Sequence, residues 1–226
     1  MKEDAETRYR EREKRFEDVM ALRRPDRVPI MVSWGFLGAI RAGMTIQEAM
    51  YDPDKLGASQ WELTHEFQPD MEQNPYGLRF LGPVLEALDF TQLKWAGHGL
   101  APDKTYQFVE GEYMKANEYD AFLDDPSDLI IRRHLPRICG HLKGLEQLPP
   151  LHEFITYYMG IPFGLAPFSS PEVDEALQAL MEAGKEAVRL AEHSRRFAAK
   201  ARDEGFPLQT GSITQAPFDT LGDFLR

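Results

Sequence analysis

Apolar residues recur along this chain with two periods, one typical of helices and one typical of short strands. Residues 3–22 are mostly charged and carry only a thin apolar stripe, which predicts a polar N-terminal helix. The apolar run at 28–32 then predicts a short buried strand. Pro29 lies near its start, where a missing backbone N–H is tolerated. The chain is therefore expected to begin with a helix followed by a strand.

Two helix-start signals follow this strand. Thr45 and Glu48 have the spacing of a capping box, in which each side chain satisfies a backbone amide of the other. Asp52 is a typical N-cap before a proline in the first helical turn. The apolar spacing carries this helix over 53–67, and residues 71–74 are the next strand candidate.

The second half of the chain is less regular until its last long helix. Residues 91–114 predict short antiparallel strands around a turn. Residues 149–171 are rich in proline, glycine and aromatic residues, which indicates a long, partly helical loop over apolar surface. A strongly amphipathic helix is expected from Pro171 to just before Gly205, a typical C-terminal stop. Residues 206–213 predict a third strand.

Strands separated by helical connections are expected to pair in parallel through right-handed crossovers. The order of elements therefore predicts an α/β fold, a partial TIM (β/α)8 barrel with about the first three βα units. The hairpin at 91–114 would be an insertion on the barrel rim. Because a complete barrel takes ~250 residues, residues 1–226 are expected to be the N-terminal part of one barrel domain. Open sheet edges would favour a homo-oligomer.

The composition of the chain limits the kinds of partner that it is expected to bind. The chain carries 26 basic and 37 acidic residues, a formal net charge of −11, and this sign argues against nucleic-acid binding. No apolar run approaches the ~20 residues of a membrane helix. The single cysteine, Cys139, excludes an intrachain disulfide. A cytoplasmic protein without membrane contact is expected.

Four stretches, taken in order, resemble the uroporphyrinogen decarboxylase superfamily. They are ALRRPDRVP at 21–29, EAMYDPDKL at 48–56, EYDAFLDDP at 118–126 and GSITQAPF at 211–218. The first two are similar to the start of the family's first barrel strand and the helix after it. The third is similar to the acidic helix start of the decarboxylase-like and corrinoid methyltransferase-like branches. The fourth resembles the strand-to-helix turn of a later βα unit.

The resemblance implies a barrel enzyme with its site at the carboxyl ends of the strands. Its reaction would be decarboxylation of a tetrapyrrole or corrinoid-dependent methyl transfer, on a small carboxylated or methylated substrate, with a corrinoid protein as a partner. The methyltransferase branch uses a zinc ion to activate a thiol. The resemblance places the zinc ligands beyond Arg226, so no metal or other cofactor is expected within this chain, which alone would be inactive.

One departure from the family pattern supports a second hypothesis about the function. Decarboxylases of this family carry an arginine-rich motif after the first strand, which holds substrate carboxylates. The corresponding stretch at 32–41 retains only Arg41. A non-catalytic ligand-binding or assembly module derived from the barrel is therefore the alternative.

The second strand supplies several candidate site residues. Residues 70–74 (DMEQN) are very polar for an inner parallel strand, which is normally rich in Val, Ile and Leu. Polar side chains at the carboxyl end of such a strand suggest a ligand site, so Gln73, Asn74 and Tyr76 are substrate-binding candidates. The alternative is that they pair with neighbouring backbone. The two acidic residues of the stretch are expected to have structural roles.

Four further residues are substrate-binding candidates. Trp34, just past the first strand, is either an aromatic wall for a flat ligand or a packed rim residue. His98 lies in a glycine-flanked loop and either contacts substrate or is an ordinary surface histidine. Thr214 and Gln215 precede a helix N-terminus, which favours an anion, with simple N-capping as the alternative.

Overall fold

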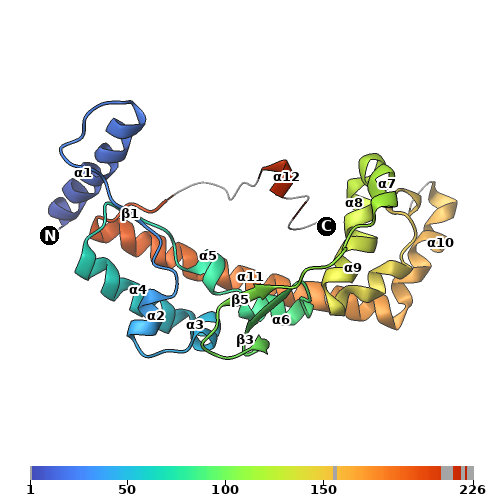
Figure 1. Cartoon of the computed structure of the whole chain (residues 1–226). Helices are drawn as coiled ribbons and strands as arrows, with labels where there is room; N and C mark the ends of the chain where they lie inside the picture. The colour runs from blue at the N-terminus through green and yellow to red at the C-terminus, as the bar shows by residue number, and fades with distance from the viewer. Residues whose placement is uncertain (1, 155–156, 210–215, 220–221, 223–226) are drawn as a thin grey trace. The chain divides into compact units, whose positions relative to one another are not determined.

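The computed structural model describes residues 2–154, 157–209, 216–219 and 222 (Figure 1). The chain divides into two compact units, which are described separately. The first contains residues 1–82, 101–105 and 187–212, and the second contains 83–100, 106–186 and 213–226. Within the described residues, no helix has both the length and the apolar character needed to cross a membrane.

The first unit is built from helices around a small parallel sheet. Its elements are α1 (Lys2–Met20), β1 (Met31–Val32), α2 (Leu37–Arg41), α3 (Ile46–Tyr51), α4 (Pro53–Phe67), β2 (Met71–Glu72), α5 (Tyr76–Arg79) and the second part of α11 (Pro171–Glu204). The expected start signals are present, because Thr45 and Glu48 form a complete capping box on α3. The Asp52 side chain caps α4 by accepting from the Lys55 N–H.

The three segments predicted as strands pair in parallel. In register, Met31 lies opposite Met71 and Val32 lies opposite Glu72. Glu72 in turn forms a parallel bridge to Leu208. β1 and β2 are shorter than predicted, and Val28 is 81% exposed, outside the ladder. The predicted third strand, 206–213, extends beyond the described residues. The coarse prediction of an α/β fold with parallel pairing is confirmed; among the described residues the sheets are small and no barrel is detected.

The core of the first unit lies between α4, α11 and the loop that follows α11. Trp61 of α4 stacks on Phe197 of α11, with ring centroids 4.7 Å apart. Phe206 lies at the edge of the same indole, and the guanidinium of Arg12 lies 4.0 Å above the Phe206 ring. These contacts hold the segment after α11 in place, so that Leu208 can bridge to Glu72 of β2. Gly205 turns the chain after α11 with φ +87°, a conformation that favours glycine.

A buried carboxylate ties the amino end of β2 to the N-terminal segment. The Asp70 side chain is fully buried and accepts two hydrogen bonds of 2.6 Å from the Arg27 guanidinium. Arg15 of α1 donates a third, at 3.0 Å, and the Ile30 N–H a fourth, at 2.9 Å. Asp70 therefore fixes where α1 and the chain before β1 meet the sheet.

The second unit is largely helical. Its elements are α6 (Gly82–Leu88), β3 (Leu93–Ala96), β4 (Gly99–Leu100), β5 (Tyr106–Phe108), η1 (Ala116–Glu118), α7 (Tyr119–Asp124), α8 (Pro126–Leu129), η2 (Ile130–His134), α9 (Leu135–Ile138), η3 (Gly140–Gln147), η4 (Leu151–Glu153), η5 (Tyr158–Gly160), α10 (Ile161–Leu165), η6 (Ala166–Ser169), the first part of α11 and α12 (Pro217–Asp219).

Two predictions for the second unit can be compared with the structure. Within 91–114, β3 pairs antiparallel with β5 as predicted, and β4 adds a short third strand. The helix that begins after Asp125 widens into a single π-helical turn, η2, just before Pro136. The missing N–H of Pro136 explains a local departure from α-helical bonding at this point.

Glu118 and Arg137 form an ion pair inside the second unit. Arg137 donates two hydrogen bonds of 2.7 Å to the Glu118 carboxylate, and a third to the Tyr113 backbone oxygen. Hydrogen bonds from Arg137, with the Lys115 N–H and nearby positive charge, lower the pKa of Glu118 to about 2 from its ordinary value of 4.5. The negative charge of Glu118 is thus strongly preferred in the folded state.

We expect Glu118→Gln to remove an acid-dependent part of stability. Because the folded pKa of Glu118 is depressed, its contribution is fully present above about pH 4.5 and is lost as pH falls towards about 2. Urea unfolding at pH 7, 4 and 3 should show the wild type ahead at pH 7, with the difference shrinking at each lower pH. An equal difference at all three would contradict the assignment.

Candidate functional site

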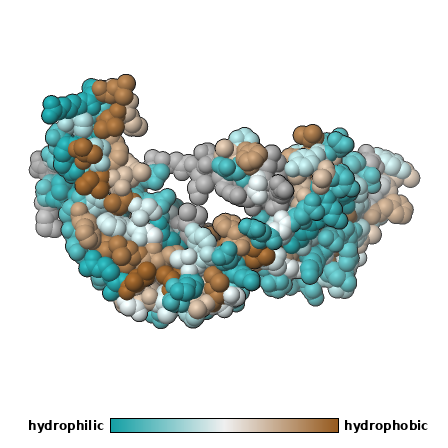
Figure 2. Space-filling view, in the orientation of Figure 1, coloured by the Kyte–Doolittle hydropathy of each residue, from teal (hydrophilic) through white to brown (hydrophobic). Residues whose placement is uncertain are grey.

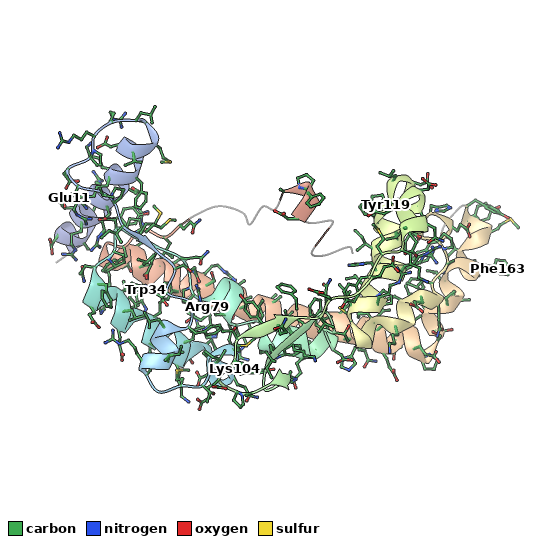
Figure 3. The ribbon with its side chains drawn as sticks, viewed as in Figure 1. Glu11, Trp34, Arg79, Lys104, Tyr119 and Phe163 are labelled. Atoms are coloured by element: carbon green, nitrogen blue, oxygen red, sulfur yellow. The ribbon has the colours of Figure 1, made fainter. Side chains whose placement is uncertain are left out.

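The carboxyl ends of β1 and β2 carry two groups of polar side chains, one on each face of the sheet. This edge is where parallel α/β sheets bind ligands, because loops and side chains from neighbouring strands converge there. Figure 3 labels one residue of each group, Trp34 and Arg79. Both groups join residues that lie far apart in the sequence.

The first group, here the strand-end group, consists of Ser33, Gln73 and Arg79. The Ser33 hydroxyl donates to the Gln73 Oε1 at 2.7 Å. Arg79, at the end of α5, donates from Nη2 to the Ser33 hydroxyl at 2.8 Å and to the Gln73 Oε1 at 3.4 Å. Arg79 is only 6% exposed, whereas Ser33 is open to solvent. The guanidinium is thus fixed behind two accessible polar side chains.

The strand-end group lies on the less covered face of the sheet. Side chains alternate between faces along a strand, so Ser33 and Gln73 share a face with Met31 and Met71. Met31 is 53% exposed and Met71 is partly exposed. This face therefore presents apolar thioethers along the strands and hydrogen-bonding groups at their carboxyl ends.

The second group surrounds Glu72, whose side chain is fully buried on the face covered by α4. Its Oε2 accepts hydrogen bonds from three neighbours: Trp34 Nε1 at 3.0 Å, Gln60 Nε2 at 3.2 Å and Thr64 Oγ1 at 2.7 Å. Among the described residues, its Oε1 has no hydrogen-bond partner. Burial raises the pKa of Glu72, and the three donors offset that rise only in part. The neutral, protonated carboxyl is favoured more than it is in water.

We expect Glu72→Gln to change how stability responds to pH. A raised folded pKa means that the native state holds the proton more tightly than the unfolded chain does. Stability of the wild type therefore falls as pH rises above about 4.5, the ordinary value. The variant cannot titrate at this position, so its stability relative to wild type should increase between pH 4.5 and pH 8 in thermal unfolding. A pH-independent difference would contradict this.

Trp34 serves as a packed rim residue in this arrangement. Its indole N–H is used by Glu72, and its ring lies 5.4 Å from that of Phe67, between centroids, in a tilted geometry. The side chain remains partly exposed at the end of β1. It lies next to Ser33 in sequence, so it borders the strand-end group without belonging to it.

The other candidates on the second strand and its loop have different surroundings. The Asn74 amide donates to the Ser194 backbone oxygen of α11 and accepts from the Tyr76 N–H. Tyr76 is buried, donates to the Pro53 backbone oxygen at 2.9 Å, and burial raises its pKa to about 12. Both residues thus bond to backbone, and of the three strand candidates only Gln73 joins the strand-end group.

The remaining candidates, His98, Thr214 and Gln215, are not among the described residues of the first unit. His98 belongs to the second unit, where its ring stacks on Trp95 with centroids 4.6 Å apart and its Nε2 lies 3.9 Å from Glu86. Thr214 and Gln215 fall outside the described residues. Arg41, the one arginine left in the family-like stretch, pairs with Glu66 at 2.6 Å on the helical surface.

Sequence reasoning missed Ser33 and Arg79 and gave Glu72 a structural role only. The position of Ser33, immediately after an apolar strand, was an available signal. No sequence pattern indicated Arg79, because this residue, at the end of α5, contacts Ser33 only in the folded chain. Glu72 was visible as an acidic residue in a strand, but its unpartnered oxygen appears only in the structure.

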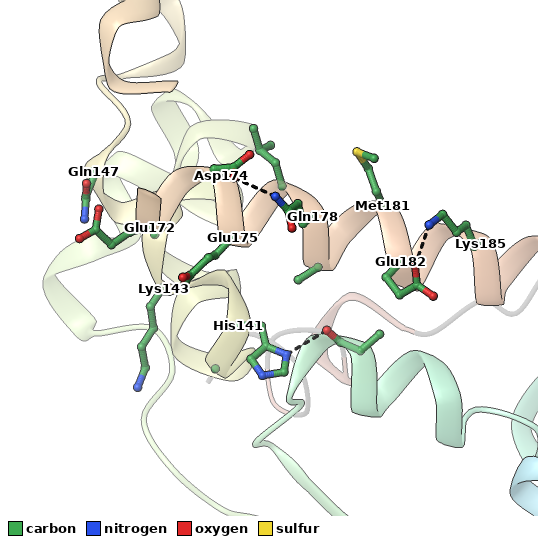
Figure 4. A pocket seen from close by; sticks show the side chains of 15 residues that line it. His141, Lys143, Gln147, Glu172, Asp174, Glu175, Gln178, Met181, Glu182 and Lys185 are labelled. Atoms are coloured by element: carbon green, nitrogen blue, oxygen red, sulfur yellow. Dashed lines mark hydrogen bonds and ion pairs between the residues drawn. The ribbon is translucent and has the colours of Figure 1, made fainter. Parts of the chain in front are cut away.

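A groove of about 1220 Å³ in the second unit is a weaker candidate. It lies between η3 and the first part of α11, and Figure 4 shows its lining. Neighbouring side chains on α11 pair with one another, Asp174 with Gln178 and Glu182 with Lys185, each at 2.8 Å. It is open and lined by solvated charges, so the strand-end group remains the better candidate.

The described residues offer no zinc site, since no three His, Cys, Asp or Glu side chains among them gather around one position. Cys139 is buried, and burial raises the pKa of its thiol to about 11, which opposes the thiolate that zinc requires. No family model, curated protein or solved structure matches the chain.

Proposed function

We propose that this chain forms the first βα units of a TIM-barrel protein of the uroporphyrinogen decarboxylase type, and that its strand-end group binds a carboxylate of a small ligand. The parallel order of β1, β2 and the bridge at Leu208 supports the barrel. The resemblance described above supports the family, with decarboxylation or corrinoid-dependent methyl transfer as the activity of the complete enzyme.

The observation that carries the proposal is the position of Arg79. A guanidinium held by Ser33 and Gln73 at the carboxyl ends of two parallel strands is already oriented before a ligand arrives. Pre-organisation lowers the entropic cost of binding. A carboxylate would take over the Nη2 hydrogen bonds that Ser33 and Gln73 now accept, because a bond from arginine to a charged oxygen is stronger than a bond to a neutral one. Ser33 is open to solvent, and its hydroxyl would turn from Gln73 Oε1 to donate to the ligand.

Binding of carboxylated ligands tests this directly. Uroporphyrin and citrate would be titrated against the chain, followed by fluorescence and calorimetry respectively. Because a hydrogen bond to a charged group contributes about 1.5–3 kcal/mol, Arg79→Met should weaken binding by roughly tenfold or more. Arg79→Lys, which keeps the charge and loses the paired geometry, should be intermediate.

Arg41→Met is the matched control, because Arg41 lies in the same unit but pairs with Glu66 on the surface. It should leave affinity unchanged. Hydroxocobalamin, followed by absorbance, distinguishes a corrinoid ligand, whose binding should not depend on Arg79. The proposal fails if the wild type binds neither uroporphyrin nor citrate. It also fails if Arg79→Met and Arg41→Met lose affinity equally.

A non-catalytic binding module is the second candidate, and one observation favours it. The strand-end group supplies donors and acceptors but no group that exchanges protons near neutral pH. Glu72, the carboxyl whose pKa is raised by burial, lies on the opposite face of the sheet. In this case the ligand would bind with the same dependence on Arg79, and mass spectrometry would show that it is recovered unchanged.

A further inference from the structure

The second part of α11 is basic, against the balance of the whole chain. Residues 187–204 carry five basic and three acidic residues, whereas the chain carries 26 and 37. His193, Arg196 and Lys200 follow one another here at intervals of three and four residues. Residues spaced in this way lie on one face of a helix. One face of α11 therefore gathers two cations and a titratable imidazole.

That face borders a small pocket between α11 and α4. The two helices meet where Phe197 stacks on Trp61, and the buried ring of Tyr76 lies 6.0 Å from that of Phe197, between centroids. The pocket has a volume of about 290 Å³, and Asp54 and Ala58 of α4 also line it. Figure 2 shows hydrophilic residues, in teal, along the outer side of α4. The pocket thus combines buried aromatic rings with a few polar groups, as sites for small ligands do.

His193 lines this pocket with its hydrogen bonds incomplete, although it is only 9% exposed. The Arg196 Nη2 lies 3.2 Å from both ring nitrogens of His193. These nitrogens point in different directions, so one amino group can align with only one of them. In a neutral imidazole the other nitrogen carries an N–H. Within the described residues this N–H has no acceptor, because Asp54 Oδ1, 3.7 Å from Nδ1, is too distant for a hydrogen bond.

The two cations of the pocket also have hydrogen-bond donors to spare. In the part of the chain that the structure describes, Arg196 donates to His193 and pairs with no carboxylate. The Lys200 Nζ lies 4.5 Å from the centroid of the Trp61 ring and 3.8 Å from Glu204 Oε1, a loose ion pair. The acid in the lining, Asp54, has a side chain that is 87% exposed. Donors therefore outnumber acceptors in the pocket, which suits an anion.

The number and kind of donors favour a phosphate group over a carboxylate. A phosphate monoester carries a charge of about −1.5 to −2 at neutral pH and three acceptor oxygens, which matches the three donor side chains. Arginine binds phosphate through paired hydrogen bonds, and lysine binds it as a point charge. A carboxylate would compensate only one of the two cations. The net charge of −11 opposes an anion weakly here, because salt screens charges beyond about 8 Å.

We propose that the pocket between α4 and α11 binds a phosphate group, free or as a monoester, through Arg196, Lys200 and the free N–H of His193. Trp61 and Tyr76 would border the organic part of a monoester. The pocket lies between two helices and shares no residue with the strand-end group. The proposal therefore goes beyond the carboxylate site and does not depend on it.

Calorimetric titration of the full chain with inorganic phosphate and with phenyl phosphate, at neutral pH, tests the site. The wild type should bind at least one of them, and Arg196→Met should weaken that binding about tenfold or more. Arg195→Met is the matched control. It removes the same charge from the next residue, which is exposed, lies outside the pocket lining and donates to the Ala191 backbone oxygen. It should leave the affinity nearly unchanged.

Ala58→Glu tests the pocket without removing any donor. Ala58 is exposed on α4 and lines the pocket, so a longer side chain there is compatible with the fold. The new carboxylate would compete with phosphate for the cations, and binding should be lost. Ala58→Gln has the same size without the charge and should retain more affinity than Ala58→Glu. Circular dichroism of each variant confirms that it is folded.

The His193 ring gives a second readout. Burial, and next the charge of Arg196, lower the pKa of His193. The charged and titratable groups around the ring are Asp54 of α4, Tyr76 of α5, and Arg189, Glu192 and Arg196 of α11. A bound anion would raise this pKa, because it stabilises the imidazolium. Sulfate stays doubly charged over the whole titration, so an NMR titration of the ring should give a higher pKa with sulfate than without it.

Three outcomes would overturn the proposal. They are a wild type that binds neither phosphate nor phenyl phosphate, equal losses in Arg196→Met and Arg195→Met, and a pKa of His193 that sulfate does not move. Benzoate that binds as tightly as phenyl phosphate would also overturn it, by assigning the pocket to a carboxylate. Tighter binding of phenyl phosphate than of phosphate supports a monoester with an aromatic body. Equal binding of the two supports recognition of the phosphate group alone.

Discussion

Replacing Asp70 with alanine is expected to lower the free energy of unfolding by about 3–5 kcal/mol, because it removes one partner of a buried charge cluster. The Asp70 carboxylate is fully buried and accepts from Arg15, Arg27 and the Ile30 N–H. Its loss leaves two guanidinium groups without their shared partner and one backbone donor unsatisfied. Urea unfolding at neutral pH, followed by circular dichroism, measures the change.

Glu66→Ala is the control for this prediction. The pair between Glu66 and Arg41 has a similar distance, 2.6 Å, but both side chains are about half exposed. Pairs of this kind contribute about 0–1 kcal/mol, because water already solvates both charges. If Asp70→Ala and Glu66→Ala had equal effects, burial would not be the reason that Asp70 matters.

Replacing Gly144 with alanine is expected to cost about 3 kcal/mol or more, the upper end of overpacking effects. A Cβ at this position would lie 1.8 Å from the Glu172 backbone oxygen and 2.9 Å from the Val173 nitrogen. The clash is with the backbone at the start of α11, which cannot move aside as a flexible side chain can. Helix η3 would have to lift from α11, exposing Leu145 and Val173, both of which are buried.

Gly184→Ala is the control for the Gly144→Ala prediction. Gly184 lies inside α11, and a Cβ there would meet nothing within 4 Å. Alanine should therefore stabilise the chain by roughly 0.5–1 kcal/mol, because a helix interior favours alanine over glycine. Opposite signs for the two glycines in thermal unfolding are the expected result. A Gly144→Ala variant as stable as wild type would show that η3 does not pack here as described.

Local signals predicted the ends of some helices, whereas α2, α5 and α6 were not predicted. Asp52 and the proline after it predicted the start of α4, and Gly205 predicted the end of α11, because caps depend on residues near one another in sequence. The first two strands were predicted in the right order but too long. Strand length depends on which backbone groups find a partner, and the Ile30 N–H donates to the Asp70 side chain, so the paired register starts at Met31.

The candidate site was only partly predictable. Gln73 could be identified because it ends a strand, a property of the sequence alone. Asn74 and Tyr76 shared that property, yet they bond to the backbone of Ser194 and Pro53. The arrangement around Arg79 arises from a tertiary contact with Ser33, which no periodicity or spacing contains. The hydrogen bond from Trp34 to Glu72 is likewise a tertiary contact that no sequence pattern contains.

The parallel bridge between Glu72 and Leu208 has a consequence for synthesis on the ribosome. Glu72 leaves the exit tunnel long before Leu208 is made, so β2 must wait with one edge unpaired while the whole intervening chain is translated. Contacts of such long sequence separation slow folding and lengthen the time during which nascent strands can pair wrongly. Chaperone capture of ribosome-bound chains should therefore persist until the segment around Leu208 has emerged.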